Sequence, residues 1–369
     1  MKESLYLQYV MAYFPTLVTE VVERLNDRRR NVMPYMFRDL LTPVFSADGK
    51  WASVLADYNR VAADVVALDS ELPLKSRDSL TTVSGNIPKL GMKLYLTEQD
   101  HKTIDSMIAQ YQANATAMPI GLVIERIFND LPRVIEGIYE RIEDIFLSEL
   151  SSGVGLSEKN NGTGVRVDVG YYDENKKGVA VVWNGNPTTS TPLDDIQAIV
   201  DKAVDDGNTI TDVWLDDYAL KALYLSTQMR GQFAFNQGIS TTSGSNVPNL
   251  DLDKVSSVFQ AQWGITPHRV SRKIKTELNG IKTTHSPWAE GQVVFTCDET
   301  LGSLVWTNVV EATRRVSGVQ YQIVDTYMLV KKYSTTDPFR EFTASEAMVV
   351  PILNNVDRIY VLDTKTQQA

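Results

Sequence analysis

The amino-acid sequence predicts an α+β fold that carries protruding segments. Three observations predict it: apolar residues recur at helical spacing between 122 and 150, short strands and helices alternate from 190 to 275, and strand-like segments fill the chain from 291 onwards. Helices followed by a run of strands are typical of α+β proteins. With 369 residues, the chain is long enough for two or three domains and a sizeable core.

The stretch 122–150 carries the strongest periodic signal in the chain. Apolar residues recur there every three or four positions, as in Ile124, Ile127, Leu131, Val134, Ile135, Ile138, Ile142, Ile145 and Phe146. A continuous helix would be about 44 Å long. Pro132 predicts either a kink or the first turn of a new helix, capped by Asn129 or Asp130. A helix this long and amphipathic needs a sheet or other helices along its length.

The segment 82–97, TVSGNIPKLGMKLYLT, has the period of a half-buried strand in its second half. Leu90, Met92, Leu94 and Leu96 alternate there with polar or small residues, and a polar run precedes them. We expect a long two-stranded arm over about 50–97. An isolated hairpin is marginal in water, so this arm needs another surface to pack against.

Helix and strand signals continue along the chain on both sides of the long helix. Thr97 and Asp100 form a capping-box pattern that predicts a helix start. Paired acids such as Asp194/Asp195 and Asp216/Asp217 fall near predicted helix N-termini, where caps and the helix dipole favour them. The alternation of short strands and helices over 190–275 predicts an α/β or α+β domain.

Composition limits the function classes. The 36 Lys and Arg against 46 Asp and Glu give a net charge of −10, which argues against a protein built to grip phosphate backbones. Cys297 is the one cysteine, so no disulfide within the chain is expected, and a reducing compartment is favoured. The sequence predicts neither a signal peptide nor a membrane span.

The sequence shows no group of residues in the pattern of a known catalytic or cofactor-binding site. His101, His268 and His285 have no second metal ligand at the usual spacing, and the common zinc, phosphate-loop and serine-nucleophile motifs are missing from the sequence. The glycine cluster at 153–164 follows a helix instead of opening one, which is the wrong context for phosphate binding. We therefore expect no enzyme and no cofactor.

The order of these parts resembles the tailed-phage major capsid protein of the Hong Kong 97-like fold, in the phage lambda major head protein branch. The resemblance runs over most of the chain. LPLKSRDSLTTVSGNIPKLGMKLYLTEQD resembles the extended loop of that branch, and the 122–152 helix lies where the spine helix does. VVWNGNPTTSTPLDDIQAIVDKA and TITDVWLDDYALKALYLS resemble the entries to its axial domain. VKKYSTTDPFREFTASEAMVVPILNNVDRIYVLDT resembles its closing strands.

That resemblance implies a domain plan and a function. It implies an N-terminal arm at 1–47, an extended loop at 48–97, a peripheral domain with the spine helix at 98–188, an axial domain at 189–325, and strands returning to the peripheral domain at 326–369. The implied function is a structural protein that self-assembles into hexamers and pentamers of an icosahedral head around double-stranded DNA. The expected location is the virion, assembled in the cytoplasm of a bacterial host.

The resemblance also implies partners and contact residues. We expect copies of the chain, separate scaffolding, portal and decoration proteins, and non-specifically packaged DNA, with no membrane. The loop would lie across a neighbouring subunit, with its apolar stripe on that neighbour or on its own spine helix. The arginine cluster would contact an acidic surface of an adjacent subunit. The expected interface residues are Lys75, Arg77, Asp78, Lys89, Leu90, Met92, Lys93, Leu94, Arg28, Arg29 and Arg30.

Two other functions stay open at this point. One is another oligomeric virion component, of baseplate or decoration type. The other is a carbohydrate-active enzyme, suggested by six Trp and sixteen Tyr. The aromatic residues are dispersed along the chain, which favours core and interface positions over a sugar-binding platform.

Overall fold

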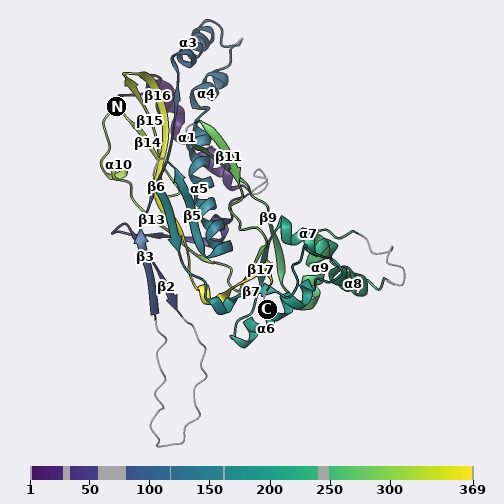
Figure 1. The fold of residues 1–369 in the computed structure, drawn as a ribbon. Coiled ribbons are helices and arrows are strands. Elements are labelled where there is room, and N and C mark those ends of the chain that lie inside the picture. The colour runs from purple at the N-terminus through teal and green to yellow at the C-terminus, as the bar shows by residue number, and fades with distance from the viewer. Residues whose placement is uncertain are drawn as a thin grey trace, which may run out of the picture. The chain divides into compact units, whose positions relative to one another are not determined.

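The computed structural model describes residues 2–27, 34–56, 80–116, 118–160, 163–239, 249–278 and 280–367 (Figure 1). The chain divides into two compact units. Unit one comprises Met1–Trp51, Gly85–Glu143 and Leu304–Pro351, and unit two comprises Ala52–Ser84, Asp144–Ser303 and Ile352–Ala369. Both units are therefore built from stretches that are far apart in the sequence.

The described helices and strands are numbered in chain order, with the labels that Figure 1 uses. The helices are α1 Leu7–Asn26, α2 Met36–Leu40, α3 Glu98–Ala113, α4 Ile120–Phe128, α5 Leu131–Ser152, α6 Pro192–Asp205, α7 Asp217–Leu225, α8 Thr227–Asn236, α9 Leu252–Trp263 and α10 Val310–Thr313. The strands are β1 Leu41–Phe45, β2 Lys50–Ala56, β3 Leu80–Asn86, β4 Lys89–Leu96, β5 Val154–Asn160, β6 Thr163–Asp168, β7 Lys176–Val179, β8 Asp212–Asp216, β9 Thr266–Val270, β10 Ile274–Leu278, β11 Ile281–His285, β12 Gln292–Thr296, β13 Gly302–Thr307, β14 Gln320–Val324, β15 Met328–Thr336, β16 Phe339–Leu353 and β17 Ile359–Gln367.

The sheet of unit one is organised around β16. Its strand order is β1-β13-β16-β15-β14, and β4 also pairs with β16. β4 runs antiparallel to β16 over its full length, from Lys89 opposite Met348 to Leu96 opposite Glu341. The half-buried strand expected in the second half of 82–97 is therefore a strand of this sheet, and an extended loop over 48–97 stays a prediction. Its apolar residues face inward in alternation, as the sequence predicts, with Leu90 and Leu96 buried.

The long helical repeat forms two helices. α4 ends at Phe128 with Asn129 as its C-cap, and α5 begins at Leu131 with Pro132 in its first turn. This is the second of the two outcomes that Pro132 allowed. Both helices bond to the sheet of unit one: Ser345 Oγ donates to the Val134 carbonyl at 2.6 Å, and Lys332 Nζ donates to the Ile127 carbonyl at 3.2 Å. The sheet thus supplies the surface that the amphipathic helix requires.

A buried carboxylate on α5 holds the N-terminus of α2. Glu143 accepts hydrogen bonds from the backbone N–H groups of Met36 and Phe37, at 3.0 and 3.1 Å. These N–H groups lie at the start of a helix, where they have no partner within the helix itself. The ring of Tyr35 packs edge-on against Tyr139, also of α5, with 5.4 Å between centroids. The segment that follows α1 therefore contacts α5 through hydrogen bonds and aromatic packing.

The sheet of unit two is mixed, with strand order β7-β17-β12-β8-β9. β8 and β9 are parallel, whereas β12 runs antiparallel to both β8 and β17. Helices α6 to α9 gather beside this sheet in Figure 1, and their buried residues form one core cluster with it. Helices and strands both occur over 190–275, as the sequence predicts, and whether this region forms an axial domain stays a prediction.

The last strand of the chain lies in unit two. β17 pairs with β12 and with β7, so the end of the segment 326–369 leaves the sheet that contains β15 and β16. The physical reason is the turn at Asn355, which has a positive φ of 52°, followed by a short 3₁₀ turn that redirects the chain after β16. How these segments form the peripheral and axial domains of an assembled subunit stays a prediction.

Gly302, at the start of β13, permits a close backbone approach to β16. A Cβ atom at this position would lie 2.1 Å from the Ile352 carbonyl oxygen and 2.9 Å from Leu353 Cα. We expect Gly302→Ala to lower the free energy of unfolding by at least about 2 kcal/mol, since backbone atoms must move to admit the methyl group. Chemical denaturation followed by circular dichroism measures this change.

Gly121 in α4 provides the matched control for Gly302. A Cβ atom there would meet nothing within 4 Å. Gly121→Ala should therefore be neutral or stabilise the protein by up to about 1 kcal/mol, because alanine loses less backbone freedom in a helix than glycine does. Equal effects of the two substitutions would contradict the close packing of β13 on β16.

Candidate assembly surfaces

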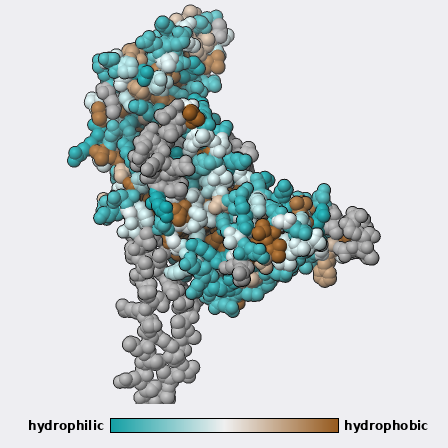
Figure 2. All heavy atoms as spheres, viewed as in Figure 1, coloured by the Kyte–Doolittle hydropathy of each residue, from teal (hydrophilic) through white to brown (hydrophobic). Residues whose placement is uncertain are grey.

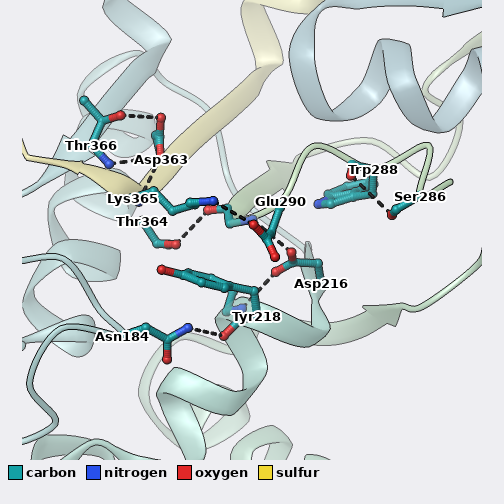
Figure 3. A network of polar contacts seen from close by, with 12 residues as sticks. Asn184, Asp216, Tyr218, Ser286, Trp288, Glu290, Asp363, Thr364, Lys365 and Thr366 are labelled. Carbon is teal, nitrogen blue, oxygen red and sulfur yellow. Dashed lines mark hydrogen bonds and ion pairs between the residues drawn. The ribbon is translucent and has the colours of Figure 1, made fainter.

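A network of polar contacts in unit two joins β17, the end of β8 and the residues just before β12 (Figure 3). Asp216 caps α7 by accepting from the Ala219 N–H at 2.8 Å, and its second oxygen accepts from the Gly291 N–H at 2.9 Å. Thr364 Oγ1 donates to the Gly291 carbonyl at 2.8 Å. Burial raises the pKa of Asp216, while the two N–H groups oppose that rise.

The rim of the same cluster is an exposed ion pair. Lys365 Nζ lies 2.7 Å from Glu290 Oε2 and 5.2 Å from the centre of the Tyr218 ring. Asn184 donates to the Tyr218 carbonyl at 3.2 Å. Since both oxygens of Asp216 bind backbone N–H groups, the cluster is a structural clamp that fixes where α7 begins relative to the sheet.

The three histidines each have one described polar partner. His101 Nδ1 bonds to the Tyr6 hydroxyl at 2.8 Å, His268 to Asp212 at 2.6 Å, and His285 to Asp144 at 2.7 Å. Burial lowers the pKa of His101. Among the described residues, no cluster of three or more His, Cys, Asp or Glu side chains could hold a metal ion. Nor is any described helix long and apolar enough to span a membrane.

Glu149 and Cys297 are buried titratable groups of unit two. Glu149 on α5 accepts from the Leu353 N–H at 2.9 Å through one oxygen, and its other oxygen has no hydrogen-bond partner within the described structure. Burial raises the pKa of Glu149 to about 8. Burial also raises the pKa of the Cys297 thiol to about 12, which makes this cysteine a poor nucleophile.

In unit one, a buried charge pair anchors the start of the chain. Glu341 accepts from the Ser4 hydroxyl and, at 3.0 Å, from the Leu5 N–H. Lys332 Nζ lies 3.9 Å from Glu341, and neither side chain is exposed. A two-way backbone bridge between Lys2 and Ser334 holds the same segment, with N–O distances of 2.9 and 3.1 Å. Sequence reasoning missed this anchor because a buried Lys and Glu look like surface residues in the sequence.

The predicted interface residues on β4 have partners within their own subunit. Lys89 forms an ion pair with Glu346 at 2.7 Å, and Lys93 Nζ lies 4.8 Å from the centre of the Phe342 ring. Leu90 is buried, while Met92 and Leu94 are half-buried. The sulfur of Met92 lies so close to Gly137 that any Cβ there would clash. This apolar stripe therefore packs on the long helix of its own chain, one of the two surfaces expected.

The remaining predicted interface residues lie outside the described part of the chain. They are Lys75, Arg77 and Asp78 of the loop, and Arg28, Arg29 and Arg30 of the arm. A role at a subunit interface stays a prediction for these residues and for Lys89, Leu90, Met92, Lys93 and Leu94.

Large apolar side chains are exposed on both units. Figure 2 shows them in small groups on a mostly polar surface. The most exposed are Phe235 at 79%, Ile281 at 69%, Val310 at 68%, Met11 at 66% and Val204 at 63%. Single exposed apolar residues are ordinary, but large apolar residues this exposed are candidates for burial in an interface.

The hairpin β10–β11 is a surface that sequence reasoning did not identify. Its register places Ile274 opposite His285 and Leu278 opposite Ile281. The signal was present in the sequence as Asn279-Gly280 between two alternating segments, which is the strongest short-range hairpin pattern. This hairpin pairs with no other strand within the described sheets.

Comparisons with known proteins identify the fold. No family model matches the sequence, and no curated protein matches it either. A prophage protein from E. coli CFT073, assigned to the capsid, matches with a TM-score of 0.58 and 12% identity over 95% of this chain and 98% of that one. A phage-related protein from Bordetella bronchiseptica RB50 has a TM-score of 0.49 and 11% identity over 99% and 98% of the two chains. The mature capsid of bacteriophage PhiM1 has a TM-score of 0.47 and 10% identity over 90% and 87%.

The first of these likenesses is strong enough to establish the fold, and the two with lower TM-scores add no weight to it. It spans nearly the whole of both chains, so it includes both units and the elements that connect them. The mixed content of helices and strands agrees with it. The chain therefore has the α+β fold of a phage capsid protein, as its sequence predicts.

Proposed function

We propose that the chain is a structural capsid protein that assembles into the hexamers and pentamers of an icosahedral phage head. The observation that carries this proposal is the fold shared with the prophage capsid protein over 95% of the chain. Large apolar side chains that are exposed in one subunit support it, because contacts between subunits would bury them. Many equivalent contacts around a closed shell stabilise it even when each contact is small.

The charge of the chain supports double-stranded DNA as non-specific cargo. A net charge of −10 gives the shell weak repulsion towards phosphate backbones, so the packaged molecule can slide along the lining. Separate scaffolding, portal and decoration proteins would complete the particle. The chain would act in the virion after assembly in the cytoplasm of a bacterial host.

Particle size tests this proposal. The purified chain is concentrated with and without an inert crowding polymer, sedimented through a gradient, and viewed by negative-stain electron microscopy. We expect fast-sedimenting closed shells, because the same contacts repeat in every subunit. Monomers under every condition, or rings of a single size with no closed particles, would contradict the proposal; rings would favour a baseplate-type component.

A further inference from the structure

The β10–β11 hairpin protrudes from unit two as an unsupported ribbon. Every residue of β11 is exposed, and Ile281 beside the turn is 69% exposed. Its base is fixed by the hydrogen bond between His285 and Asp144 and by the burial of Ile274. A two-stranded ribbon is marginally stable in water, and each of its strands leaves one edge unpaired within the described sheets. These features indicate that the ribbon contacts a partner.

The ribbon and the residues that lead into it from β9 are together basic in an acidic chain. The segment 268–285 carries five Lys and Arg residues against one acid, Glu277, for a net charge of +4. Since the whole chain has a net charge of −10, the rest of it carries −14. Residues two apart share a face of a strand, and Lys282 lies opposite Glu277, so Lys275 and Lys282 project from one face.

The lysines of this face are available for a partner. No described ion pair involves Lys275, and the contact of Lys282 with Glu277 is long, at 3.7 Å, between exposed side chains. Because Lys282 lies opposite Glu277, it is two residues along the ribbon from Lys275. The two lysines are therefore spaced about 7 Å apart along the ribbon.

Helix α6 offers a matching acidic face. Asp201 and Asp205 are exposed one turn apart, which spaces them about 6 Å along the helix axis. Asp201 accepts a hydrogen bond from Gln197 at 2.6 Å, and no described ion pair involves either acid. The nearby cation of the same helix, Lys202, is already bound to Asp206 at 2.5 Å. Within unit two, β11 and α6 lie at opposite ends in Figure 1, so the ribbon does not reach this helix of its own chain.

We propose that the lysine face of the β10–β11 hairpin docks on the Asp201–Asp205 face of α6 in a second copy of the chain. Different surfaces of the two copies meet in this contact, and such contacts form closed rings when the rotation between copies closes. Rings of this kind are the building blocks of the shell, so this inference rests on the proposed self-assembly. The contact would set the order of subunits around each ring.

A second copy fits the ribbon better than a nucleic acid does. The two faces of the ribbon differ, since the face opposite the lysines carries Ile281 and Thr283. A protein neighbour can contact both faces, whereas a phosphate backbone would use the lysines alone and leave Ile281 in water. The acidic remainder of the chain also weakens the approach of nucleic acid.

A charge-exchange experiment tests the contact. The hairpin variant Lys275→Glu/Lys282→Glu should assemble with an association constant lower by about tenfold or more, since two attractive pairs become repulsive. The helix variant Asp201→Lys/Asp205→Lys should show a similar loss. Combining all four substitutions restores opposite charges and should recover assembly. Light scattering across a concentration series measures association, and circular dichroism confirms that each variant is folded.

The control variant is Lys102→Glu/Lys221→Glu, which reverses two exposed lysines on α3 and α7. It should assemble like the wild-type chain. Normal assembly by the hairpin variant, or a loss that the fourfold variant does not recover, would overturn the proposed contact. Normal empty shells from the hairpin variant with lost binding of duplex DNA would assign the ribbon to nucleic acid instead. Failure of the wild-type chain to assemble would count against the proposed function itself.

Discussion

Replacing Ile138 with Asp is expected to abolish folding of unit one. Ile138 is 2% exposed in the middle of α5, between the equally buried Ile135 and Ile142. An ionised carboxylate without a partner costs several kcal/mol in such a site, and the net stability of a folded protein is roughly 5–15 kcal/mol. The variant should be insoluble on expression, or lose its near-ultraviolet circular dichroism and its cooperative melting transition.

The matched control is Arg133→Asp, which places the same residue on the exposed side of the same helix. Position 133 lies in the first turn of α5, where an acidic side chain interacts favourably with the helix dipole. This variant should fold and melt within about 0.5 kcal/mol of the wild type. A soluble Ile138→Asp protein with wild-type melting would show that the apolar stripe faces solvent.

Replacing Glu149 with Gln is expected to remove a large part of the pH dependence of stability. The pKa of this buried carboxyl is about 8 in the folded chain against an ordinary value of 4.5. A raised pKa means that the folded state holds the proton more tightly than the unfolded state. The stability that Glu149 contributes is therefore complete below about pH 4.5, and it is lost as the pH rises towards 8.

The size of this effect follows from linkage. Each pH unit between the two pKa values changes the free energy of unfolding by about 1.4 kcal/mol, so the total loss is of the order of several kcal/mol. Glutamine keeps the acceptor for the Leu353 N–H but cannot ionise. The variant and wild type should be similarly stable near pH 5, and the variant should be more stable near pH 9.

Denaturant unfolding at both pH values measures the difference between the two proteins, which cancels the titration of all other groups. An equal pH dependence in the wild type and in Glu149→Gln would show that the carboxyl is solvated in the folded chain.

Local signals in the sequence predicted the helices well. Thr97 and Asp100 form the expected capping box, with the Asp100 N–H donating to Thr97 Oγ1 at 3.3 Å and the Thr97 N–H donating to Asp100 at 3.0 Å. Pro132 marks the start of a new helix, and Gly153, with φ of +78°, ends it. Each of these signals acts within one helical turn, so it can be interpreted without knowing the rest of the fold.

Strand pairing was less predictable because it joins distant segments. The alternation of Leu90 to Leu96 predicted which face of β4 is buried, but nothing local indicates β16 as its partner, some 250 residues further along. The same holds for β17, which crosses to the sheet of unit two. Buried charges such as Lys332 and Glu341 were missed for a related reason: their burial depends on a tertiary contact with the first residues of the chain.

The candidate assembly surfaces also differ in how much of them the local sequence could predict. The apolar stripe on β4 was recognisable from its period, and the structure places it on the long helix. The lysine face of β10–β11 was recognisable in principle from Asn279-Gly280 and the surrounding lysines. The match to α6 depends on the distance between two lysines on the hairpin and the distance between two acids on the helix. Both distances follow only from the folded elements.

Single-particle cryo-electron microscopy of the assembled chain tests the central claim most directly. The account predicts closed icosahedral shells in which this one chain forms both five-fold and six-fold rings, each subunit having the two-unit fold described above. A particle of one fixed ring symmetry, an open tube, or a shell in which this chain only decorates the lattice of another protein would contradict it.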